Sequence, residues 1–197
     1  MDLKDSMIFI KKEISYMKKI AIATVIALAA GLASAADSFT VESQRINNAG
    51  AAAQQQYVLG IKKDFKGFAG DLAFSNAQTD GTNALSTRIE AGATVAGPVG
   101  LYARVATGQK YSNTADFTYY SVEPGIAVAV PGVAGLTAKA GYRFRSAFQS
   151  ANNDQTHTAR YSLTHALSKV DTVAVKYDRV QGDSNQKVVA VAYTRGF

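Results

Sequence analysis

The sequence predicts an all-β fold: one closed antiparallel transmembrane β-barrel of about ten strands, with eight and twelve strands as alternatives. Ten segments alternate apolar and polar side chains with a period of two residues, the pattern of a strand with two unlike faces. Most segments have the roughly 9–11 residues that a tilted membrane strand needs. No apolar stretch beyond the start of the chain reaches the length of a membrane helix, so a membrane-spanning fold of the remaining chain must be a barrel.

The first five predicted strands each pair an apolar face with a polar face. They are Ser38–Arg45, Gln56–Phe65, Phe68–Ala77, Leu85–Val95 and Gly100–Tyr111. In the second of them, Leu59 and Ile61 share one face and oppose Lys62 and Asp64. The polar faces are rich in charge and in small residues, which favours an inside-out barrel, apolar toward lipid and polar toward a lumen.

The last five predicted strands repeat this division. They are Phe117–Val130, Gly135–Phe148, Thr156–Leu167, Asp171–Gln181 and Gln186–Phe197. In the second of these, Tyr142 and Phe144 share one face and oppose Arg143 and Arg145. Alternation therefore continues to the end of the chain.

The connections between the segments fall into two alternating kinds. Tight turns are predicted at 66–67, 96–99, 131–134 and 168–170, and more polar, mostly longer loops at 46–55, 78–84, 112–116, 149–155 and the short 182–185. Tight turns on the periplasmic side and longer loops outside are the pattern of outer-membrane barrels. An even strand count puts both termini on the tight-turn side. A soluble β-sandwich, the alternative by strand count, would not sort its loops in this way.

The chain begins with a predicted secretory signal. Met17-Lys18-Lys19 is a short basic region, residues 20–32 are apolar, and Ala33-Ser34-Ala35 is a small-x-small cleavage site. The apolar run is shorter than the roughly 20 residues of a spanning helix, which argues against an uncleaved anchor. We therefore expect residues 1–16 to reflect a start site placed too early, 17–35 to be a signal peptide removed after export through the Sec pathway, and 36–197 to form the barrel.

The last strand ends on Phe197, with a second aromatic, Tyr193, four residues earlier. This arrangement resembles the C-terminal assembly signal of bacterial outer-membrane barrels, although Arg195 stands where that signal favours an apolar residue. The resemblance implies a bacterial outer-membrane location, outer-membrane lipids and lipopolysaccharide as surroundings, and the barrel-assembly machinery as a partner that reads Tyr193 and Phe197.

Few charges fall on the predicted lipid face, and each lies near a strand end: Lys63, Arg179, Lys187 and Arg195, with His157 and His165. A base there costs roughly 0–1 kcal/mol, against roughly 2–4 at the bilayer midplane. Because both His residues face lipid, they are badly placed to serve a luminal nucleophile, and we expect no enzymatic activity.

Composition excludes several other functions. The chain has no Cys, hence no disulfide and no thiolate ligand or nucleophile. The net charge of +6 is a mild excess without a basic run, so nucleic-acid binding is not expected. No metal-ligand spacing or phosphate-binding loop occurs, and no cofactor is predicted.

The polar faces supply the candidate site residues. Predicted pore-lining bases are Arg104, Lys139, Arg143, Arg145, Arg160 and Lys176, and predicted pore-lining acids are Glu42, Asp64, Asp71, Glu90 and Glu123. Strands five to nine are thereby net basic and strands one to four net acidic, which places a transverse field across the lumen. Two interpretations remain open: a narrow pore, or a plug of ion-paired charges, since ten strands lie near the closed end of barrel sizes.

Three stretches resemble the oligogalacturonate-specific porin family: residues 119–125 (Tyr-Tyr-Ser-Val-Glu-Pro-Gly), 141–145 (Gly-Tyr-Arg-Phe-Arg) and 177–179 (Tyr-Asp-Arg). The resemblance implies a narrow monomeric channel with a basic lumen that suits acidic sugars, although that family is usually built with twelve strands. The expected function is passive passage of small hydrophilic, possibly anionic, solutes. The alternative is a closed structural or surface-interaction barrel, and the oligomeric state is left open.

Overall fold

A computed structural model describes residues 37–48, 50–77, 83–111, 116–148 and 155–197. The predicted start site, signal peptide and cleavage site lie outside these residues. Within them the chain forms β1 (Ser38–Asn48), β2 (Gln54–Phe65), β3 (Phe68–Ala77), β4 (Asn83–Ala96), β5 (Val99–Tyr111), β6 (Phe117–Ala129), β7 (Leu136–Ala147), β8 (Thr156–Ala166), β9 (Asp171–Gly182) and β10 (Gln186–Gly196).

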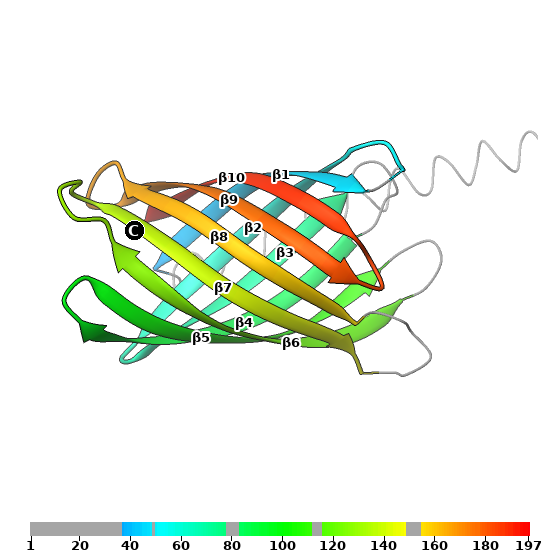
Figure 1. Cartoon of the computed structure of the whole chain (residues 1–197), viewed down its shortest axis with the longest axis horizontal. Coiled ribbons are helices and arrows are strands. Elements are labelled where there is room, and N and C mark those ends of the chain that lie inside the picture. Colours follow the sequence, from blue (N-terminus) through cyan, green and yellow to red (C-terminus); the bar gives the residue numbers. More distant parts are fainter. Residues whose placement is uncertain (1–36, 49, 78–82, 112–115, 149–154) are drawn as a thin grey trace, which may run out of the picture. The chain divides into compact units, whose positions relative to one another are not determined.

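The strands form one closed ring (Figure 1). Each pairs antiparallel with its neighbour in sequence, and β1 pairs with β10 from Ser38 opposite Gly196 to Asn48 opposite Gln186. The predicted closed antiparallel barrel is confirmed, with ten strands. Closure matters because it leaves no sheet edge with unpaired backbone groups, which a lipid environment would penalise.

The ring has two unlike ends. At the turn end lie the connections 66–67, 97–98, 130–135 and 167–170, together with the first residue of β1 and the last of β10. At the loop end β1, β3, β5, β7 and β9 end and β2, β4, β6, β8 and β10 begin. The connections 66–67 and 97–98 have two residues each, and in the first Gly67 has a φ of 91°, which glycine adopts without steric cost.

Strand ends lie within three residues of the predicted bounds, and both ends of β3 match them. The largest difference is at β1, which runs on to Asn48. It does so because Ile46 points into the barrel and packs with Val180 and Val188, a small apolar cluster inside the loop end. The polar residues Asn47 and Asn48 thus continue a ladder although their composition is typical of a loop.

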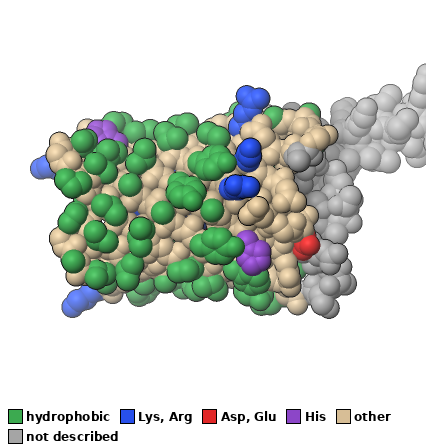
Figure 2. Space-filling view, in the orientation of Figure 1, with side chains coloured by type: hydrophobic (Ala, Val, Ile, Leu, Met, Phe, Trp, Pro, Cys, Tyr) green, Lys and Arg blue, Asp and Glu red, His purple; other side chains and the backbone are tan. Residues whose placement is uncertain are grey.

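The barrel is apolar outside and polar inside. Outward-facing Leu163 and Val191 are each more than half exposed, whereas inward-facing Glu123 and Thr158 are almost fully buried. Hydrophobic side chains cover most of the wall seen in Figure 2. In the part of the chain that the structure describes, no helix is long and apolar enough to cross a membrane.

Candidate functional site

The candidate site is the charged interior of the barrel. Alternation along each strand turns all the predicted pore-lining residues inward, on the face opposite the exposed apolar residues. Asp64 lies less deeply in the barrel than the others. Its side chain is 56% exposed at the turn-end mouth, where it pairs with Lys62 at 2.7 Å. The others lie deeper, and most of them make contacts with one another.

Glu123 on β6 is the centre of these contacts. Its Oε2 accepts a bond from Arg160 Nη1 at 2.9 Å, and its Oε1 accepts bonds from Tyr102 Oη at 3.1 Å and Arg104 Nη1 at 3.4 Å. Arg160 also binds Asp178 at 3.0 Å. With its side chain only 3% exposed, Glu123 needs these donors, because a buried carboxylate without partners is costly.

Other pairs join strands that are not neighbours in the ring. Glu90 on β4 binds Arg104 on adjacent β5 and also Lys139 on β7, the latter at 2.8 Å. Glu42 on β1 binds Lys176 on β9, two strands away. The acidic and basic walls are thus linked by direct ion pairs.

Small residues make these long contacts feasible. Ala190 and Ala192 lie on β10, between Glu42 and Lys176, and each is only 3% exposed. Gly125 and Gly141 are register partners on β6 and β7, and the ring and hydroxyl of Tyr102 occupy the space a Cβ at either position would need. Tyr102 therefore lies flat against the wall and screens Glu123.

The loop-end half of the interior holds two further bases of β7, Arg143 and Arg145. Arg143 donates from Nη2 to Thr158 Oγ1 at 3.3 Å, and its buried Nε has no hydrogen-bond partner in the structure. No carboxylate of the described residues pairs with Arg143. Arg145, two residues further on, stacks over the Tyr119 ring at 5.2 Å.

The interior keeps accessible surface. The side chains of Arg88, Lys139 and Lys176 are each about 30% exposed although they point inward and are ion-paired. The Asp71 partner of Arg88 is 19% exposed. Space for water thus remains along the interior beside the salt bridges.

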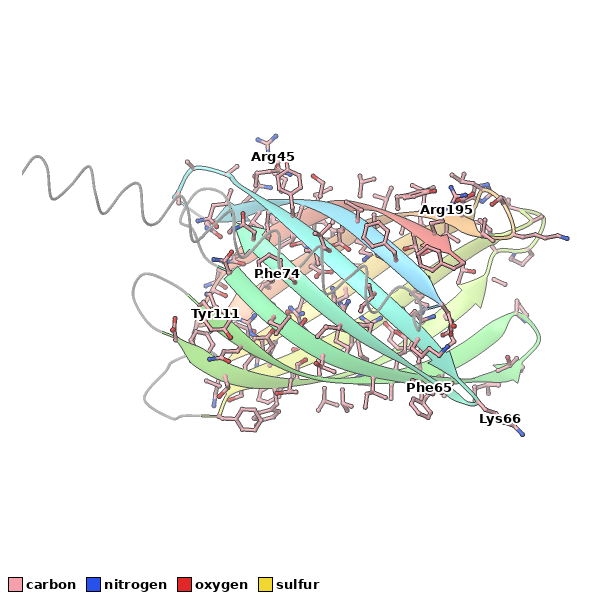
Figure 3. All side chains as sticks on the ribbon, turned by 180° about the vertical axis from the view of Figure 1, so that it is seen from behind. Arg45, Phe65, Lys66, Phe74, Tyr111 and Arg195 are labelled. Atoms are coloured by element: carbon pink, nitrogen blue, oxygen red, sulfur yellow. The ribbon has the colours of Figure 1, made fainter. Side chains whose placement is uncertain are left out.

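The sequence analysis did not single out three residues of interest, two that face inward and one that faces lipid. Tyr102 and Lys110 share the inward face of β5 with Arg104, and Arg45 projects outward from β1 (Figure 3). The alternation was sufficient to place all three. The role of Tyr102 could not be predicted from the sequence, because it depends on the strand register that places Gly125 and Gly141 beside this side chain.

Neither histidine is arranged for catalysis. Both face outward, as predicted, and His157 lies among aromatic rings, 5.3 Å from Phe144 and 5.9 Å from Tyr142 between ring centroids. The part of the chain covered by the structure holds no group of three His, Cys, Asp or Glu suited to a metal ion.

The two residues of the predicted assembly signal lie at the turn end on the lipid side. Tyr193 donates to Asp171 Oδ1 at 2.5 Å, and Phe197 is 72% exposed. The backbone N–H of Phe197 donates to the carbonyl of Asp37 at 3.1 Å, which ties the last residue to the start of β1. Whether they act as a signal stays a prediction.

Comparison with known proteins shows the fold. No protein-family model matches the chain, and no curated protein matches its sequence. A solved NanC porin superposes with a TM-score of 0.58 at 6% identity, covering 81% of this chain and 100% of that one. A KdgM porin, solved in complex with disordered oligogalacturonate, superposes with a TM-score of 0.52 at 11% identity, covering 80% and 99%. The predicted likeness to small outer-membrane porins is confirmed at the level of fold.

Proposed function

We propose that this chain is a non-enzymatic outer-membrane channel through which small hydrophilic solutes diffuse. The observation that carries the proposal is the accessible surface left on inward, ion-paired side chains such as Arg88 and Lys139. Charged groups that line an open, wet interior are typical of barrels with an aqueous lumen. The fold neighbours described as porins are consistent with this function.

We further propose a weak preference for anions. Most luminal carboxylates are engaged by a cation, while Arg143 in the loop-end half makes no ion pair with a described carboxylate. A solute that enters from the loop end meets this charge before it reaches the paired middle of the barrel. The attraction weakens with salt because the Debye length falls to about 3 Å at 1 M.

The ion-pair network favours a second candidate, a closed barrel without a conducting pore. Direct bridges from β4 to β7 and from β1 to β9 would obstruct a lumen already near the closed end of barrel sizes. In that case the charges serve folding alone.

Single-channel recording of the purified protein in planar bilayers separates the two candidates. We expect small, stable conductance steps and a reversal potential in a salt gradient that shows weak anion preference. Arg143→Glu should shift the reversal potential toward cations, whereas Arg143→Lys should leave it nearly unchanged. Absence of conductance would support the closed barrel, and cation preference in the unsubstituted protein would contradict the proposed role of Arg143.

A further inference from the structure

A row of bases crosses the outside of the barrel at the loop end. Lys187 on β10 is the register partner of Arg179 on β9, and Arg45 on β1 lies diagonally beside Lys187. All three side chains are exposed on the lipid-facing side. Figure 2 shows blue side chains gathered at this end of an otherwise apolar wall, and Figure 3 shows Arg45 projecting from it.

These bases are unpaired within the described part of the chain. None of the three makes a hydrogen bond or an ion pair within the residues that the structure describes. Like charges placed directly opposite on neighbouring strands repel each other and destabilise the pair. The chain therefore carries an electrostatic cost at this position that no ion pair among the described residues offsets.

The turn end shows that the fold can supply such partners. The two outward-facing Lys and Arg side chains on the described strands there are both paired: Lys63 with Asp37 at 2.8 Å and Arg195 with Asp171 at 3.7 Å. The same barrel thus balances its lipid-facing bases at one end and not at the other. The contrast suggests that the balancing charge at the loop end comes from outside the chain.

The position of the row fits a lipid headgroup. Tyr177 and Val189, a register pair, are the next outward residues toward the middle of the barrel, so the apolar band stops directly below Arg179 and Lys187. Bases immediately above an apolar band lie at headgroup depth, where their burial cost is small. Arg and Lys bind phosphate oxygens through charge-assisted hydrogen bonds, and Arg does so with two parallel bonds.

We infer that Arg45, Arg179 and Lys187 form a binding site for the phosphate groups of a phosphorylated glycolipid in the outer leaflet, that is, the lipid A part of lipopolysaccharide. The inference uses the proposed outer-membrane location but not conduction, since a closed barrel would present the same row.

The test is lipid binding to the purified protein in a zwitterionic detergent at low salt, with bound lipid counted by native mass spectrometry. Bisphosphorylated lipid A should bind the unsubstituted protein, and Arg179→Gln with Lys187→Gln should weaken that binding roughly 30-fold, since each base near a charged lipid surface contributes a factor of about five. Adding Arg45→Gln should weaken it further. The matched control, Lys63→Gln with Arg195→Gln, removes two bases from the turn end and should bind as the unsubstituted protein does.

Two further ligands identify the source of the phosphate. Dephosphorylated lipid A should bind weakly and equally to all variants, and inorganic phosphate should displace lipid A only at a large excess. Equal binding of both lipids, an equal loss in the turn-end control, or inorganic phosphate binding as tightly as lipid A would each overturn the inference. Heat-modifiable gel mobility shows that each variant is folded, and conductance measured on the same samples tests the channel separately.

Discussion

Lys and Arg side chains on the strands are paired with carboxylates at the turn end of this barrel, whereas several of those at the loop end are not paired with any described carboxylate. At the turn end the chain supplies its own partners: Asp37 for Lys63, Asp171 for Arg195, and Asp64 for Lys62. At the loop end Arg45, Arg179 and Lys187 outside, and Arg143 inside, have no carboxylate partner among the described residues. The difference suggests a division: charges that the chain pairs are structural, and charges that it leaves open are available to ligands.

In this division, the charges in the middle of the barrel fall with those at the turn end, because they too are paired within the chain. Glu123, Arg160 and Asp178 form a buried cluster whose members satisfy one another, as a buried ion pair must if it is not to destabilise the fold. Removing a paired charge should therefore cost stability, whereas removing an open charge should cost binding or selectivity and little stability.

The largest expected effect comes from Glu123→Gln. Loss of this charge leaves Arg104 and Arg160 facing each other across a site that is hardly exposed, and breaking a buried pair on one side typically costs about 3 kcal/mol or more. Urea unfolding in detergent, followed by gel mobility, measures the change. Asp64→Asn is the matched control, because its pair with Lys62 is largely exposed and such pairs contribute roughly 0–1 kcal/mol. Equal costs in the two variants would contradict the division.

The sequence was enough to predict which side chains face inward, because the period-two pattern survives in every strand and the tight turns fix the order of neighbours. Strand ends were less predictable: Asn47 and Asn48 read as loop residues, yet Ile46 inside the barrel holds them in the ladder. Local composition cannot report a contact made with a strand at the other end of the chain.

The ion pairs were beyond the reach of the pattern for a related reason. Arg160 binds Glu123 across an intervening strand, and Lys139 reaches Glu90 across two. Such contacts depend on the register of several strand pairs at once and on Gly141 having no side chain. By contrast, the exposed position of Arg45 did follow from alternation along β1 and was overlooked.

An intermediate effect is expected at the last residue. Phe197→Ser retains the backbone hydrogen bond to Asp37 but removes an exposed aromatic, so closure of the ring should persist while recognition by the assembly machinery is lost. We expect the amount of folded protein in the outer membrane to fall several-fold, measured by fractionation and heat-modifiable mobility. Phe65→Ser removes another exposed aromatic at the turn end, one that stacks on Phe68 at 4.7 Å, and serves as the control. Similar losses in both would mean that lipid contact, and not a terminal signal, explains the effect.

The smallest expected effect is the pH dependence contributed by Asp37. Its carboxylate accepts from Lys63 Nζ at 2.8 Å and from the backbone N–H of Asp64 at 2.7 Å, and the hydrogen bond from Lys63 is the main cause that lowers the pKa of Asp37 below its usual range. Because the pKa is lower in the folded protein than in the unfolded chain, this contribution is complete above the unfolded pKa and is lost as pH falls through the folded one. The unsubstituted protein should thus be slightly more stable than Asp37→Asn near neutral pH, and the difference should vanish once the pH falls below the folded-state pKa of Asp37. If the Asp37→Asn difference stayed constant from neutral to acid pH, the turn-end pair would not be the ionic contact that distinguishes this end from the other.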